Sequence, residues 1–217
     1  MEGIALYFRV HNESYLQALC EHLEISFFSI FFAMLLAIPL GIWGTKYKWA
    51  HKIIFGFFGA LRVIPSLAIL IVCIPILGTG RMSAIVALSI LAIPPILMNT
   101  VLGIEGIDSS MLGVANGMGM SKSQIFFKVK IPLALPAVLT GMRIATVEVI
   151  ASATLAAYIG AGGLGTLVFA GLSLLHAGQS LLLVGGISVA MLSLSASAFL
   201  YRLTLWSTRY KFEGGKA

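Results

Sequence analysis

Residues 113–121 read GVANGMGMS, and the chain then runs through two lysines to VKIP at residues 129–132, which contains a third. This glycine-punctuated, basic stretch lies between two long apolar runs, which end near residue 104 and begin again near residue 133. If those runs cross a membrane, a polar segment between them lies outside the lipid. The stretch therefore marks a water-exposed insert inside an otherwise membrane-like chain.

The composition points to a protein that is covered largely by lipid. Of the 217 residues, 59% are hydrophobic and 10% are charged, and the mean hydropathy is +1.01. A soluble domain carries about 25% charged residues. The net charge of +6 could suggest nucleic acid, but the basic residues form no stripe with interleaved aromatics. Cys20 and Cys73 show neither metal-ligand nor disulfide spacing, so we expect no metal site.

Hydropathy predicts an all-α membrane protein with about five transmembrane helices. A helix needs about 20 mostly apolar residues to cross a bilayer. The stretches that qualify are 25–45, 53–77, 83–104, 133–158 and 181–201. The second carries Arg62 and is expected to bend near Pro65. Residues 159–180 are rich in glycine and are expected to form an outer loop, a partial helix or a re-entrant segment.

Lysine and arginine placement predicts the orientation of these spans. The basic residues of three segments fall on one side of a five-span chain: Lys46, Lys48, Lys52, Lys122, Lys128, Lys130, Arg202, Arg209, Lys211 and Lys216. The other side holds Arg9 and Arg81. The acidic start of the chain is unlike a cleavable signal peptide. We expect a multi-pass protein of the cell membrane, a single transmembrane domain over residues 1–217, with its amino terminus outside and its carboxyl terminus in the cytoplasm.

The insert is predicted to form two short helices with a turn between them. Ser109 or Ser110 is expected to cap the first helix beside Asp108, and Ser121 to cap the second. Gly117 and Gly119 are placed in the turn, where glycine permits a positive φ and close approach by another surface. From the residues alone, an interfacial amphipathic hairpin without a protein partner is equally consistent.

The insert resembles the coupling loop of ABC importer permeases. In that family the motif runs Glu-Ala-Ala, three residues, Gly, nine residues, and Ile-x-Leu-Pro. Gly119 and Pro132 take the glycine and proline places, but residues 113–115 read Gly-Val-Ala, so the usual Glu is missing. The resemblance implies that residues 108–132 form a cytoplasmic coupling loop that contacts an ATPase through Ala115, Gly117, Met118, Gly119, Met120, Ser121, Gln124 and Pro132.

Three further stretches resemble the osmoprotectant branch of these permeases. They are IPSLA at 64–68, IPPILMNT at 93–100 and ATLAAYIGAGGLG at 153–165. The resemblance implies a permease subunit of an ATP-driven importer for glycine betaine, carnitine or choline. A methionine-type amino-acid permease, which shares the coupling loop and GAGGLG, is the alternative, and a non-ABC channel or exporter is the second alternative.

The resemblance also implies the partners. They are a dimer of ABC ATPase subunits, a second permease (identical or homologous), an extracytoplasmic substrate-binding protein and membrane lipid, with no nucleic acid. ATP and Mg would bind the ATPase partner, and no cofactor is expected in this chain. The chain contains no Ser/His/Asp set, paired catalytic acids or Walker lysine, so we expect no catalytic residues and no enzymatic activity of its own.

Candidate residues of the translocation path or gate are Pro65, Ser66, Glu148, Gly160, Gly162, Gly163 and Gly165. The last glycines satisfy GxGxxG, but a dinucleotide site also needs an acid about 20 residues later. No acid occurs between Glu148 and Glu213, so we favour a flexible outer gate, with a plain connector as the alternative. Arg143 and Glu148 are five residues apart, about 140° around a helix, and should not pair with each other. Glu148 is expected either to meet the path or to pair with another span.

Overall fold

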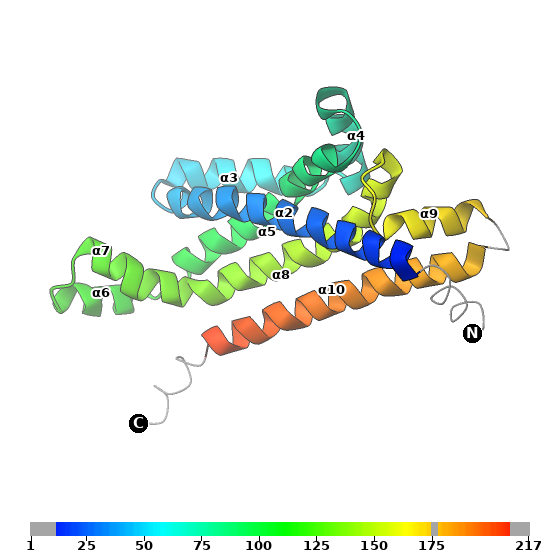
Figure 1. Cartoon of the computed structure of the whole chain (residues 1–217). Coiled ribbons are helices and arrows are strands. Elements are labelled where there is room, and N and C mark those ends of the chain that lie inside the picture. Colours follow the sequence, from blue (N-terminus) through cyan, green and yellow to red (C-terminus); the bar gives the residue numbers. More distant parts are fainter. Residues whose placement is uncertain (1–11, 175–177, 209–217) are drawn as a thin grey trace.

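The computed structural model describes residues 12–174 and 178–208, and in this part of the chain every regular element is a helix (Figure 1). Four basic residues used in the orientation argument, Arg9, Arg209, Lys211 and Lys216, lie outside the described residues. The helices, in chain order, are α2 (Asn12–Gly44), α3 (Lys48–Leu61), α4 (Ser66–Leu77), α5 (Arg81–Glu105), α6 (Ser109–Gly117), α7 (Lys122–Ile125), the π-helix η1 (Phe126–Lys130), α8 (Ile131–Ala156), the 3₁₀-helix η2 (Ala157–Ile159), α9 (Gly165–Ser173) and α10 (Gln179–Ser207).

The all-α prediction with about five spans is confirmed. Four helical stretches are long and apolar enough to cross a membrane, namely α2, α5, the 38-residue stretch Lys122–Ile159 and α10. A bent pair, α3 with α4, makes a fifth candidate. The first described helix, α2, already includes Asn12, well before the predicted span at Ile25, so it carries acidic residues that the hydropathy pattern excluded from the span. Within 159–180, the partial helix is α9.

The predicted bend near Pro65 is confirmed, and it breaks the helix completely. The axes of Trp49–Leu61 and Ser66–Leu77 meet at 95°. Proline cannot donate a backbone hydrogen bond, and it keeps the preceding residue out of the helical region. Pro65 is accordingly the N-cap of α4, with an extended ψ of 137°.

Helix α5 forms the centre of the bundle. Of its apolar stretch, 61% is buried, compared with 11% of the corresponding stretch of α10. α5 packs against α2 on one side and α8 on the other, and α10 packs on α8 and α9. Glycines allow these close approaches: Gly41 of α2 faces Thr100, and Gly141 of α8 faces Asn99 and the Pro95 carbonyl of α5.

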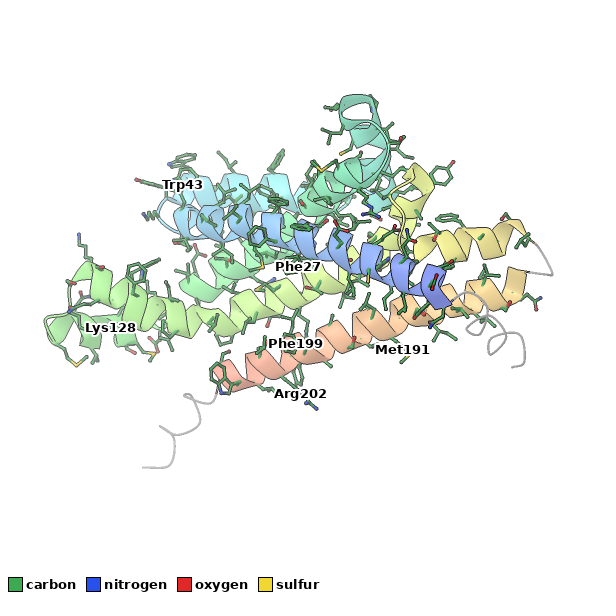
Figure 2. All side chains as sticks on the ribbon, in the orientation of Figure 1. Phe27, Trp43, Lys128, Met191, Phe199 and Arg202 are labelled. Carbon is green, nitrogen blue, oxygen red and sulfur yellow. The ribbon has the colours of Figure 1, made fainter. Side chains whose placement is uncertain are left out.

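The outer faces of α2 and α10 present large apolar side chains. Phe27 and Phe199 are each 64% exposed, and Met191 is 66% exposed; Figure 2 labels these side chains on α2 and α10. Such a continuous apolar surface is stable in hydrocarbon and is unusual on a monomeric soluble protein. These faces therefore identify the lipid-facing sides of the bundle.

The loops divide between two ends of the bundle. At one end, which we call the basic end, the last turns of α2 and α5 meet the first turns of α8, through Gly41 against Thr100 and Gly103 against Ala137. Lys46, Lys122, Lys128 and Lys130 belong to this end. At the opposite end, Arg81 at the start of α5 lies beside Glu21 of α2. The described basic loops thus share one end, as the orientation argument requires.

Gly141→Ala should destabilise the fold, because an added Cβ would lie 2.7 Å from both Asn99 Cβ and the Pro95 carbonyl oxygen. We expect a loss of about 1–3 kcal/mol, typical of overpacking, and a lower midpoint of thermal unfolding in detergent. Gly186→Ala in α10 is the matched control, because nothing lies within 4 Å of its added Cβ. It should leave the midpoint unchanged or raise it slightly. Equal midpoints for the two variants would contradict this packing argument.

Candidate functional site

The insert at the basic end begins with a capped helix that projects beyond the bundle (Figure 1). Asp108 is the N-cap of α6, and its carboxylate accepts a hydrogen bond of 2.9 Å from the Ser110 backbone N–H. The prediction that Ser109 or Ser110 is the cap was therefore wrong; the acid itself performs this role. The same N–H of Ser110 holds the pKa of Asp108 below its usual value, so the cap is ionised at neutral pH.

The turn after α6 is closed by one glycine in the left-handed region. Gly119 has φ of 75°, its N–H donates to the Asn116 carbonyl, and the N–H of Met120 donates to the Ala115 carbonyl. This pair of bonds forms a Schellman motif, which requires a positive φ after the helix. Gly117, which was also predicted in the turn, is the last residue of α6. The conformational requirement therefore falls on Gly119.

Helix α7 is fixed by the predicted cap at Ser121. The Ser121 hydroxyl accepts from the Gln124 N–H at 3.3 Å, and the Gln124 side chain accepts from the Ser121 N–H at 2.8 Å. This reciprocal pair is a capping box. Ile125 is buried behind it, the chain continues through η1, and Pro132 lies in the first turn of α8, directly after this π-helical turn.

The insert exposes apolar side chains outside the membrane-spanning part of the bundle. Val114 is 62% exposed, Met118 69% and Phe127 63%. Val114 belongs to α6, Met118 is the C-cap of α6, and Phe127 belongs to η1. Lys122 and Lys128 are exposed beside them, and Figure 2 shows Lys128 projecting from this end. An apolar patch rimmed by charge is typical of a protein–protein contact. Ala115 differs, because it is buried against the turn.

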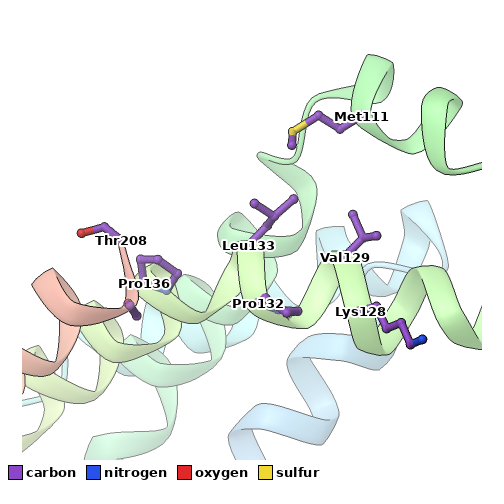
Figure 3. Close-up of a pocket in the computed structure, with 8 residues that line it drawn as sticks. Met111, Lys128, Val129, Pro132, Leu133, Pro136 and Thr208 are labelled. Atoms are coloured by element: carbon purple, nitrogen blue, oxygen red, sulfur yellow. The ribbon is translucent and has the colours of Figure 1, made fainter. Parts of the chain in front are cut away.

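A cavity of about 480 Å³ joins the insert to the end of α10. Figure 3 shows Met111 of α6 above Leu133 and Pro136 of α8, with Thr208 approaching from the end of α10. Pro132 and Val129 line the same cavity. The cavity places the last turn of α10 within reach of the insert, a relation that the sequence did not reveal.

At the opposite end, residues 160–165 form a tight backbone segment, which we call the glycine segment. Gly160, Gly162 and Gly163 have φ of 79°, 86° and 84°, which other residues rarely adopt. Gly165 has a different role: a Cβ there would collide with the Thr154 carbonyl and Ala157. The backbone just before the segment is tied to the α4–α5 loop, because the Gly80 N–H donates to the Ile159 carbonyl at 2.9 Å.

The glycine segment is also held by α2, through a residue that sequence reasoning did not single out. The Gly163 N–H donates to Glu21 Oε2 at 3.0 Å, and Arg81 donates to Glu21 Oε1 at 2.5 Å. Arg81 also pairs with Glu24 at 3.2 Å. These partners are about 60 to 140 residues from Glu21, so no local pattern links them. The cluster of acids before the first apolar run was the available indication.

The remaining path candidates lie between the two ends. Pro65 is exposed in the α3–α4 break, and Ser66 begins α4. Glu148 of α8 is half-buried, and Arg62 in the α3–α4 break is exposed. As predicted, Glu148 and Arg143 face different neighbours, because Arg143 stacks over the Tyr201 ring of α10 at 5.4 Å. The described residues contain no cluster of three metal-ligating side chains.

The structure does not gather the predicted site residues at one place. The coupling candidates lie at the basic end and the glycine segment lies at the opposite end. One helical stretch, Lys122–Ile159, runs from the first set to the second. Glu148 is carried on this stretch. The insert and the glycine segment therefore lie at opposite ends of the bundle, and one helical stretch connects them.

Comparison with known proteins gives a consistent result. Residues 37–206 match the family described as binding-protein-dependent transport system inner membrane component. The chain is 39% identical to the carnitine transport permease protein OpuCB of Listeria monocytogenes, over 100% of both chains. It is 42% identical to the glycine betaine/carnitine/choline transport system permease protein OpuCB of Bacillus subtilis, over 71% of each.

The fold is shared with solved ABC transporters. A structure of the inward-facing MetNI methionine ABC transporter matches 90% of this chain and 96% of its own, with a TM-score of 0.77 at 23% identity. An amino acid ABC transporter solved with histidines matches 92% of this chain and 96% of its own, with a TM-score of 0.76 at 15% identity. At these identities the likeness concerns the fold alone.

The helical architecture, the coupling-loop motif and the relatives that match along the whole chain agree. The chain belongs to the family of binding-protein-dependent transport system inner membrane components, and its relatives there are permease subunits of osmoprotectant ABC transporters.

Proposed function

We propose that this chain is the membrane-spanning permease subunit of an ATP-driven importer for a quaternary-ammonium osmoprotectant such as glycine betaine, carnitine or choline. The observation that carries the proposal is the similarity, over the full chain, to a carnitine transport permease. The exposed apolar patch at the basic end supports it, because a patch of this kind, rimmed by charge, is suited to contact with a partner such as an ATPase. The basic end faces the cytoplasm, in line with the positive-inside rule.

The coupling surface would dock on an ABC ATPase. Met118, Val114 and Phe127 supply apolar contact area, and Gly119 leaves open space, since nothing lies within 4 Å of an added Cβ. Two ATPases would hold two permeases, and substrate would pass between the permeases as the ATPases close and separate. An extracytoplasmic binding protein would deliver the substrate at the opposite end, where the glycine segment serves as the outer gate.

The charges within the spans suggest how a zwitterion would pass. Glu148 of α8 and Arg62 of the α3–α4 break both belong to predicted spans, and ionisable groups in a membrane usually face a pathway or a bundle interior. Glu148 would meet the ammonium group and Arg62 the carboxylate of a substrate such as betaine. A purely cationic substrate such as choline would rely on Glu148 alone.

Gly119→Asp should leave the protein in the membrane and weaken its docking to the ATPase at least tenfold, which corresponds to 1.4 kcal/mol or more. Copurification of the ATPase and substrate-stimulated ATP hydrolysis measure this effect. Gly119 has two proposed roles: it adopts the positive φ of the turn, and it leaves space for close approach by the partner. Gly119→Asn tests the second role without the added charge, because both Asn and Asp visit the left-handed region. If the partner approaches the turn closely, the Asn variant should also weaken docking, whereas intact docking with both variants would contradict the coupling assignment.

Glu148→Gln should impair uptake of choline about tenfold more than uptake of betaine, because the zwitterion keeps its contact with Arg62. The measurement is uptake of both solutes by the reconstituted complex with its ATPase and binding protein. Glu148→Asp keeps the charge and should retain more choline uptake than Glu148→Gln. Equal losses for the two solutes would make Glu148 a structural residue.

The same assay tests the substrate class. Uptake of at least one quaternary-ammonium solute by the unaltered complex is the expected result. Uptake of methionine, with no uptake of betaine, carnitine or choline, would replace the proposal with an amino-acid permease of the same fold. Uptake that continues without ATP would favour a channel.

A further inference from the structure

The opposite end of the bundle carries a polar cluster centred on Glu21, a residue outside the family motifs quoted above. Glu21 uses both carboxylate oxygens: Oε1 accepts from Arg81 at 2.5 Å and from the Gln17 amide at 3.2 Å, and Oε2 accepts from the Gly163 N–H at 3.0 Å. The Glu21 side chain is 17% exposed, while Arg81 is 44% exposed. One half-buried carboxylate therefore joins α2, the start of α5 and the glycine segment.

The backbone of the glycine segment is shaped to fit this carboxylate. A Cβ on Gly162 would collide with Glu21 Oε2, and a Cβ on Gly163 would lie 3.2 Å from His22 Nδ1. His22 is itself fully buried, with Nε2 3.1 Å from the Ile150 carbonyl of α8. The two neighbouring residues Glu21 and His22 thus contact the glycine segment and α8 on adjoining sides. Leu164 is completely buried in this arrangement.

The closed arrangement also buries polar atoms that find no protein partner among the described residues. They are His22 Nδ1, Ser26 Oγ, Ser83 Oγ and Thr154 Oγ1. They belong to α2, the first turn of α5 and the last turn of α8, and His22 also lies against Gly163. Burial of an unpaired polar group disfavours a structure, so these groups favour separation of the helix ends. The charged hydrogen bonds of Glu21 act in the opposite direction.

We infer that Glu21 is a positioning residue that latches the glycine segment to α2 and α5, and that it sets how readily this end of the permease opens during transport. The unpaired polar atoms disfavour the packed arrangement and the hydrogen bonds of Glu21 favour it. Such opposing contributions keep the free energies of a packed and an open state close, so that both states can be populated. The inference rests on the proposed role of the glycine segment as the outer gate. It assigns to Glu21 the control of that gate, and it gives Arg81 the supporting role of orienting the carboxylate.

Glu24 supplies a matched control for the test. It pairs with the same Arg81 at 3.2 Å but makes no described hydrogen bond to the glycine segment. Glu21→Gln and Glu24→Gln each remove one negative charge beside Arg81. A latch predicts different effects for the two substitutions, whereas a general effect of local charge predicts equal effects.

The reporter is Leu164→Cys in a background with Cys20 and Cys73 replaced, in intact cells that produce the complete transporter. Its rate of labelling by a membrane-impermeant maleimide measures how often the buried position opens to the outside. Glu21→Gln should raise this rate about tenfold, and Glu24→Gln should change it less than about twofold. Glu21→Asp, which shortens the side chain by one methylene, should give an intermediate labelling rate. It replaces Glu21→Gln in the experiment if the Gln variant does not accumulate in the membrane.

A coupling readout separates a latch from a general loss of stability. In the reconstituted complex, Glu21→Gln should raise the ATP hydrolysed per solute taken up, because a loosened gate opens without completing a transport cycle. A merely unstable variant would lower hydrolysis and uptake in proportion. Unchanged labelling with Glu21→Gln and Glu21→Asp, or equal changes with Glu21→Gln and Glu24→Gln, would overturn the inference. The labelling needs no substrate, so its outcome is independent of whether the substrate proposal holds.

Discussion

The close approach of α5 to α8 is the interaction on which the rest of the structure depends. Two glycines make it possible: Gly141 of α8 lies against the Pro95 carbonyl, and Gly103 of α5 lies against Ala134 and Ala137. In lipid, association of helices relies on packing of this kind, since burial of apolar surface gains little there. α5 is consequently the most buried span, and α2 and α10 are arranged around the pair that it forms with α8.

This central pair determines what each end of the molecule can do. α8 continues without a break from the insert, through the π-helical turn at residues 126–130, to the glycine segment. A displacement of the insert by a docked partner would therefore act directly on the helix that carries Glu148 and leads to the glycine segment. At the far end, Glu21 of α2 accepts a hydrogen bond from the Gly163 N–H, so both α2 and α8 hold this segment.

Much of the fold could be predicted from the sequence, because hydrocarbon imposes simple requirements of length and apolarity. The break at Pro65 followed from the missing N–H of proline, and the cap at Ser121 from its spacing to Gln124.

The predicted start of the first span was less accurate, because polar residues extend this helix through contacts with a distant part of the chain. The first turns of α2 carry Glu21 and Glu24 because Arg81 neutralises them, and Arg81 is about 60 residues away. Likewise, the local pattern could not show that Gly117 completes a helix while Gly119 closes the turn. The roles of the candidate site residues remain predictions, since they depend on partners that contact the two ends.

The central claim is that events at the cytoplasmic insert control opening at the glycine segment through α8. The most direct test is the labelling rate of Leu164→Cys from the outside in the assembled transporter, compared between the nucleotide-free complex and a complex with trapped nucleotide. The account predicts that trapping nucleotide on the ATPase, which contacts only the insert end, changes the rate at this distant position severalfold. An identical rate in both states, with the ATPase shown to remain bound, would contradict it.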